Sequence, residues 1–207
     1  MSKKLSEMSL EELWQLFPIF LTEHQACWKE WYEEEAASLR AVLPLDKVKR
    51  ISHIGSTAVE TIWAKPIVDI LVEISEACDI QSMKEILCSN GWICMSQNDS
   101  RISFNKGYTE HGFAKQVYHL HLRYEGDNSE LYFRDYLIAY PEAAKAYEKL
   151  KLDLWKEFEH NRDGYTEAKT GFVSEYTRQA KQKYGARYDV LEKREFPFWK
   201  KHDIIDT

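Results

Sequence analysis

The chain has 207 residues and a formal net charge of −6, a length that fits one domain with a substantial core. Its hydrophobic content of 44% excludes a disordered protein, and its negative charge argues against a nucleic-acid partner bound through the phosphate backbone. No run approaches the roughly 18 apolar residues of a membrane span, and the N-terminus lacks the apolar core of an export signal, so we expect a cytoplasmic protein that does not enter a membrane.

The first forty-odd residues have the periodicity of helices. Ser9-Leu-Glu-Glu12 is a capping-box pattern, which predicts that a helix begins there. Apolar residues from Trp28 to Leu39 follow helical spacing up to Pro44. We therefore expect residues 1–19 to form an N-terminal helical extension, followed by a longer helix.

Two apolar strands are predicted next, over residues 48–54 and 67–74, with a turn at Gly55-Ser56 after the first. In a strand, alternate side chains point to opposite faces. The uniformly apolar set of the second strand, which must face the core, is Val68, Ile70, Val72 and Ile74. Asp69 therefore lies on the opposite face, where a ligand can reach it.

A helix over residues 79–90, ending at Gly91, precedes strands predicted over 92–96, 101–106 and 115–124. In the last of these strands, His119 and His121 share the face opposite to the apolar residues. Helices are predicted over 129–140, from Pro141 to about 158, and over 161–184. Residues 185–207 form a charged tail without a clear period.

The turn and the second strand suggest a phosphate and metal site. Backbone N–H groups and hydroxyls at Gly55, Ser56 and Thr57 can bind phosphates, and the carboxylate of Asp69 can bind the accompanying cation. A Gly-Ser pair alone is typical of any turn, and an aspartate in a strand is most simply a solvent-exposed residue. Their spacing is what favours a site: Gly55-Ser56 directly follows one strand, and Asp69 lies in the next strand, 13 residues beyond Ser56.

The histidine pair offers a second set of ligands. Two residues apart on one strand, the imidazoles of His119 and His121 are separated by about 7 Å, which suits a shared metal or ligand site. The alternative is two polar residues on a half-exposed sheet face. If this strand lies next to the strand of Asp69, all three side chains converge into one metal site.

Several cationic and aromatic residues are further candidates for binding phosphates or a nucleotide. They are Lys65 and Lys106, Arg134, and the pair Tyr165 and Lys169, which lie four residues apart on one helix face. Each has a simpler alternative: a surface lysine, an internal ion pair of Arg134 with Asp135, or a solvated helix face.

At these residues the chain resembles the GrpB family, bacterial proteins assigned by fold to the nucleotidyltransferase superfamily that includes DNA polymerase beta. The matching blocks run from about residue 20 to 184: His53–Val59, Ala64–Ile70, Tyr118–Leu122, Phe133–Leu137, Pro141–Ala144, and Tyr165–Lys169 with Phe172. The resemblance implies an α/β (α+β) fold, with a small mixed β-sheet flanked by helices and a helical C-terminal half. All of residues 1–207 would then form a single domain.

The superfamily resemblance also implies a mechanism. A Gly-Ser motif holds the nucleotide phosphates, and strand carboxylates bind two divalent metals that position the attacking hydroxyl. Gly55, Ser56 and Asp69 match these parts, but Leu71 stands where a second acid is usual and the histidines stand where a third acid is expected. Because magnesium prefers oxygen ligands, an Asp/His/His site favours zinc or manganese over magnesium.

The leading hypothesis is a nucleotidyltransferase that binds a nucleotide or another phosphorylated small molecule with a divalent metal (Mg, Mn or Zn) and transfers a nucleotidyl group to a small acceptor. Leu71 favours an alternative, a catalytically degenerate protein that binds a ligand or a partner. The histidine pair favours another, a metal-dependent hydrolase or phosphotransferase. The sequence does not indicate the oligomeric state.

Overall fold

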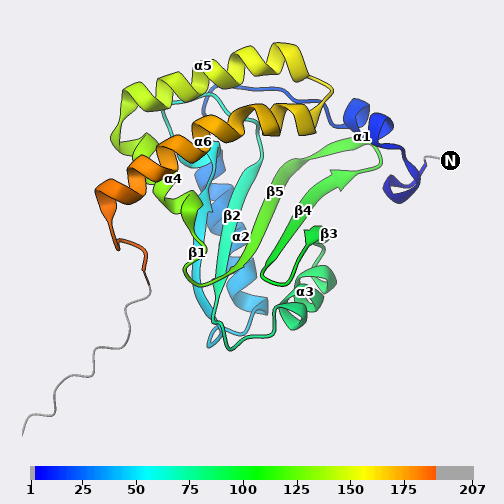
Figure 1. The fold of residues 1–207 in the computed structure, drawn as a ribbon. Coiled ribbons are helices and arrows are strands. Elements are labelled where there is room, and N and C mark those ends of the chain that lie inside the picture. Colours follow the sequence, from blue (N-terminus) through cyan, green and yellow to red (C-terminus); the bar gives the residue numbers. More distant parts are fainter. Residues whose placement is uncertain (1–2, 190–207) are drawn as a thin grey trace, which may run out of the picture.

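The structure is a computed structural model that describes residues 3–189. A five-stranded mixed sheet forms its centre, in the order β1-β2-β5-β4-β3 (Figure 1). The strands are β1 (Val48–Ile54), β2 (Val68–Ile74), β3 (Ile93–Gln97), β4 (Arg101–Thr109) and β5 (Gly112–Tyr124). The helices are η1 (Leu5–Glu7), α1 (Leu10–Leu16), α2 (Cys27–Val42), η2 (Ser56–Ala58), α3 (Ile80–Ser89), α4 (Ser129–Ala139), α5 (Pro141–Phe158) and α6 (Arg162–Tyr184). This arrangement confirms the predicted mixed sheet with a helical C-terminal half.

The predicted alternation of β2 is confirmed, and it builds the main core. The four apolar residues that were expected inside are fully buried and pack with α2 and α3: Val68, Ile70, Val72 and Ile74. Leu120 and Leu122 of the neighbouring β5 join the same cluster. This face of the sheet is therefore closed by two amphipathic helices.

The other face of β2 is also largely covered, which its alternation alone does not show. Leu71 is fully buried against Ile54 of β1 and Leu131 of α4. Glu73 is buried as well and accepts two hydrogen bonds from the Arg50 guanidinium, at 2.5 and 3.0 Å. Asp69 is therefore the residue of this face that remains open, at the end of the strand where the helices leave a cavity.

The N-terminal part follows the sequence expectation only in part. Ser9 caps α1 as predicted, with Glu12 N–H donating to the Ser9 hydroxyl and Ser9 N–H donating to the Glu12 carboxylate. Residues 17–26 are not helical, because Pro18 interrupts the helix and Thr22 pairs in antiparallel fashion with Ala64. Of the predicted tail, residues 190–207 lie outside the described part of the chain. No helix within residues 3–189 is long and apolar enough to cross a membrane.

Candidate functional site

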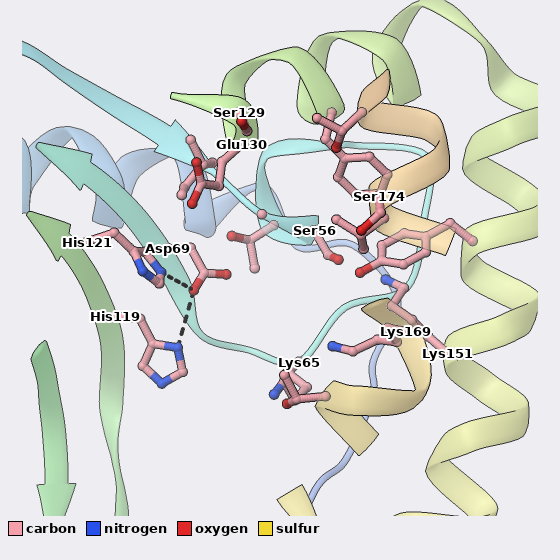
Figure 2. A pocket seen from close by; sticks show the side chains of 18 of the residues that line it. Ser56, Lys65, Asp69, His119, His121, Ser129, Glu130, Lys151, Lys169 and Ser174 are labelled. Atoms are coloured by element: carbon pink, nitrogen blue, oxygen red, sulfur yellow. Dashed lines mark hydrogen bonds and ion pairs between the residues drawn. The ribbon is translucent and has the colours of Figure 1, made fainter. Parts of the chain in front are cut away.

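The pairing of β2 with β5 brings the predicted carboxylate and the two histidines together. The strands run parallel, with Asp69 opposite His119 and Leu71 opposite His121. His119 Nδ1 lies 3.2 Å from Asp69 Oδ1, and His121 Nε2 lies 3.7 Å from the same oxygen (Figure 2). The expected convergence of the three side chains is thus observed.

The second nitrogen of each imidazole has a hydrogen-bond donor beside it. Tyr108 Oη lies 2.8 Å from His119 Nε2, and Arg123 Nη2 lies 3.3 Å from His121 Nδ1. Because an ionised carboxylate only accepts hydrogen bonds, the nitrogens facing Asp69 carry the protons and the remote nitrogens accept. His119 therefore donates a hydrogen bond to Asp69, whereas His121 Nε2, at 3.7 Å from the same oxygen, lies just beyond hydrogen-bond distance.

The charge state of this group follows from the same contacts. Burial alone would raise the pKa of Asp69, but the hydrogen bond from His119 and the adjacent imidazole of His121 outweigh it and hold that pKa far below its usual value. Burial lowers the pKa of His119, although the Asp69 carboxylate partly offsets the effect. The site thus contains an ionised carboxylate supported by a neutral imidazole at His119.

The hydrogen bonds of the two histidines bear on the predicted Asp/His/His metal site. A metal needs a free nitrogen lone pair, and here the available lone pairs of His119 and His121 accept hydrogen bonds from Tyr108 and Arg123. Within residues 3–189, no group of three or more His, Cys, Asp or Glu is arranged to hold a metal ion. A single magnesium ion shared between Asp69 and ligand phosphates does fit, because magnesium is commonly bound by one or two carboxylates, phosphates and water.

The Gly55 turn is pressed directly against Asp69. Gly55 has a φ of 71°, and a β-carbon built there would lie 2.3 Å from Asp69 Oδ2. The hydroxyl of Thr57 lies 2.9 Å from His53 Nε2 and donates a hydrogen bond to the Ile67 carbonyl. Thr57, which was predicted to bind phosphate, therefore uses its hydroxyl to stabilise the turn. Ser56 faces the cavity beside Asp69 (Figure 2).

A cavity of about 880 Å³ opens in front of Asp69. Its lining is rich in cations for a protein of net negative charge, and two acidic residues, Asp69 and Glu130, accompany them. The cationic residues are Lys65, Lys151, Arg162, Lys169, Arg178 and Lys181. Such a surface attracts a small anionic ligand.

Three of these lysines are grouped on the side of the cavity that faces Asp69 (Figure 2). Lys65 and Lys169 lie over the ring of Tyr165, at 5.3 and 4.2 Å from its centroid. Lys151 is 2% exposed and donates to the Trp63 carbonyl. Among residues 3–189, none of the three has a carboxylate within ion-pair distance.

Burial without a carboxylate partner changes how these lysines titrate. Burial and, to a smaller extent, the charges of neighbouring cations lower the pKa of Lys65 and of Lys151 to about 7, and that of Lys169 to about 8. Tyr165 is 1% exposed, and its hydroxyl has no hydrogen-bond partner among residues 3–189. Unpartnered polar groups of this kind are expected where a ligand binds.

Two predicted phosphate partners lie elsewhere. Arg134 donates to the Asp135 carboxylate and to the His53 carbonyl, and it does not line the cavity. Lys106 pairs with Glu35 at 2.7 Å, at the other face of the sheet. For Arg134 the structure shows the internal pairing with Asp135 that was the simpler alternative, whereas Lys106 forms an ion pair with Glu35 instead of lying free on the surface.

Sequence reasoning did not identify Lys151 and Arg162. Lys151 follows Ala144 and Tyr147 on the buried stripe of α5, with Leu154 after it, so a lysine among apolar positions was the available signal. Arg162 is the first residue of α6 and lies over the ring of Tyr108, 5.5 Å from its centroid. Its position depends on how the helices pack, which no local pattern reveals.

Comparison with known proteins agrees with the resemblance seen in the sequence. Residues 18–179 match the model of the GrpB protein family. The chain is 35% identical over 163 residues to the glutamate-rich protein GrpB of Alkalihalophilus pseudofirmus, covering 76% of this chain and 92% of that protein. It is 30% identical over 158 residues to the UPF0157 protein YqkA of Bacillus subtilis, a longer protein of which 45% is covered.

A crystal structure of the conserved protein GrpB from Enterococcus faecalis superposes with a TM-score of 0.69 at 29% identity, covering 80% of this chain and 99% of that one. The Cid1 poly(U) polymerase, in its Mg 3′-dATP-bound form, has a TM-score of 0.46 at 12% identity, covering 70% of this chain and 49% of that one. A likeness of that size does not bear on activity. The family match and the sequence relatives show that this chain belongs to the GrpB family.

Proposed function

We propose that the cavity binds a nucleotide or another phosphorylated small molecule, and that the protein transfers a nucleotidyl group from it to a small acceptor. The observation that carries this proposal is the group of one buried and two partly buried lysines, without a carboxylate in ion-pair distance, facing one ionised carboxylate across an 880 Å³ cavity. Burying several cations together is costly unless an anion joins them. A polyphosphate supplies that anion.

Each part of the site has a role in this proposal. Lys65, Lys151 and Lys169 bind the phosphate oxygens, and the hydroxyls of Ser56 and Tyr165 donate hydrogen bonds to them. Asp69 would hold a divalent ion against the phosphates, and that ion would neutralise charge on the leaving group. His119 and His121 orient the carboxylate and keep it ionised.

One observation favours a second candidate, a protein that binds the same ligand without turnover. Leu71 occupies the position where a second metal-binding acid is usual, and it is fully buried among Ile54 and Leu131. Asp69 is then the only carboxylate of β2 that lines the cavity. The two metal ions of the usual mechanism would both have to bind to this one side chain, which favours binding without turnover. The hydrolase alternative depended on imidazole ligands, and the hydrogen bonds of His119 and His121 do not favour it.

A two-stage experiment tests the proposal. Isothermal titration with ATP and MgCl2 is expected to show saturable binding, which Lys169→Ala weakens at least tenfold and Lys149→Ala, an exposed lysine of α5, leaves unchanged. Incubation with α-³²P-labelled nucleoside triphosphates and a cell extract as the acceptor source is then expected to label a small product. Asp69→Asn should abolish labelling. Binding without any labelled product would support the second candidate, and no binding of any nucleotide would contradict both.

A further inference from the structure

A second, smaller cavity of about 320 Å³ lies beside the basic one. Its walls are mostly apolar and aromatic. They come from the non-helical segment 17–20, from residues 66–67 before β2, and from residues 113–117 of β5. The rings of Phe17, Phe20 and Phe113 form a cluster, with the Phe17 and Phe20 centroids 5.0 and 6.3 Å from that of Phe113.

The two cavities adjoin, because Lys65, Ile67 and Arg162 line both of them. Two of these shared residues are cations. A single molecule can therefore place an apolar group in the smaller cavity while its charged groups pass Lys65 and Arg162 into the larger one. The arrangement of apolar pocket, cationic boundary and basic cavity matches a ligand with one apolar end and one anionic end.

The smaller cavity is preformed, because hydrogen bonds hold the segment of residues 17–22 in place. Ile19 N–H donates to the Glu159 carbonyl at 2.8 Å, which fastens the segment to the end of α5. Thr22 and Ala64 exchange two backbone hydrogen bonds of 3.0 Å, which fasten it again beside β2. A pocket held open in this way lowers the cost of ordering the protein around a ligand.

We propose that the smaller cavity is the subsite for a planar aromatic ring, such as a nucleobase, of the phosphorylated ligand, and this inference rests on the proposed function. Aromatic walls favour a flat ring over a flexible chain, because rings stack and pack edge to face at low entropic cost. The polar side chains of the pocket are all cationic, namely Lys65, Lys115 and Arg162. Cations also pack well against aromatic faces, so the subsite accepts different rings with little discrimination.

The test compares ATP with inorganic tripolyphosphate, which lacks the ring, by isothermal titration in the presence of MgCl2. Stacking of a base against aromatic side chains typically strengthens binding by roughly five- to hundredfold, so the wild type is expected to prefer ATP by such a factor. Phe20→Ala removes one wall, and Ala114→Trp fills the cavity. Phe20 is 37% exposed and Ala114 is exposed, so neither change disturbs the core.

In both variants the preference for ATP should fall towards one, while the affinity for tripolyphosphate stays within about twofold of the wild type. The unchanged tripolyphosphate affinity shows that each variant is folded. Leu45→Ala, which also removes an exposed apolar side chain, should keep the full preference. A preference that persists in both variants, or is absent from a wild type that binds tripolyphosphate, would overturn the subsite and leave the proposed function standing. Failure of both probes to bind would overturn the two together.

Discussion

Gly55 and Asp69 are in such close contact that a β-carbon on residue 55 would lie 2.3 Å from the carboxylate oxygen Oδ2. The turn after β1 and the carboxylate of β2 therefore form one unit. An L-residue at position 55 would also adopt a left-handed φ of 71°, which is costly without glycine. The glycine is thus required for two separable reasons, backbone conformation and contact with Asp69.

Gly55→Ala is expected to lower the free energy of unfolding by at least about 2 kcal/mol, because strain and the clash with Asp69 add together. Gly91→Ala is the matched control, since Gly91 has a φ of 87° and open space around it. It should cost on the order of 1 kcal/mol from strain alone. Urea unfolding of both variants measures the difference, and equal losses would show that the contact with Asp69 has no energetic consequence.

Lys151→Met should stabilise the unliganded protein while it weakens phosphate binding. The change removes a buried ammonium group and keeps its apolar stem, so the melting temperature should rise by about 2–4 °C, corresponding to roughly 1 kcal/mol. Lys149→Met, on the exposed side of the same helix, is the control for the loss of one positive charge. A lower melting temperature for Lys151→Met would mean that the hydrogen bond to the Trp63 carbonyl outweighs the cost of burial.

The affinity for an anion should depend on pH in a defined direction. Lys65 and Lys151, with pKa values of about 7, and Lys169, with a pKa of about 8, are charged below these values and neutral above them. Sulfate keeps its charge between pH 6 and 9, so its affinity reports the protein alone. It should fall roughly tenfold or more over this range, as each pKa unit corresponds to a factor of ten. An affinity that is constant or rises with pH would contradict the lysine cluster as the binding site.

The stability of the unliganded protein should rise with pH, whereas the affinity for an anion should fall. Because burial lowers the pKa of these lysines, the unfolded chain binds more protons than the folded one between about pH 7 and 10. The lysines therefore make the folded state more stable as pH rises through this window. The advantage of Lys151→Met over the wild type should shrink from pH 7 to pH 9, as measured by thermal melts across that range.

Tyr108→Phe tests the hydrogen bonds that keep the histidines from binding metal. Removing the hydroxyl frees the Nε2 lone pair of His119, on the side of the ring away from Asp69. The variant is therefore expected to bind Zn²⁺ at least tenfold more tightly than the wild type in a competition titration with a chromophoric chelator. Tight stoichiometric zinc binding by the wild type, lost in His119→Ala, would restore the metal site predicted from the sequence.

The sequence was sufficient for the local geometry of the site. The alternation of β2 placed Asp69 away from the core, the Gly55-Ser56 pair marked the turn, and the spacing of His119 and His121 placed both imidazoles on one face. These predictions succeeded because each depends only on residues close in sequence: the side chains of a strand alternate between its two faces, and a tight turn needs a glycine.

What the sequence could not supply was the contact between distant segments. The parallel pairing that sets Asp69 opposite His119 joins residues 50 positions apart, and no local pattern fixes that register. The donors Tyr108 and Arg123, which turn the histidines from metal ligands into supports for Asp69, also arrive only on folding. The bond from Arg134 to the His53 carbonyl is a further contact of this kind, because it joins residues 81 positions apart.

A crystal structure of the protein with α,β-methylene-ATP and MgCl2 tests the central claim most directly. The claim predicts that the phosphates lie between the lysine group and Asp69, within hydrogen-bond distance of Lys65 or Lys169. A nucleotide bound with its phosphates outside this cavity, or crystals that take up no nucleotide at millimolar concentration, would contradict it.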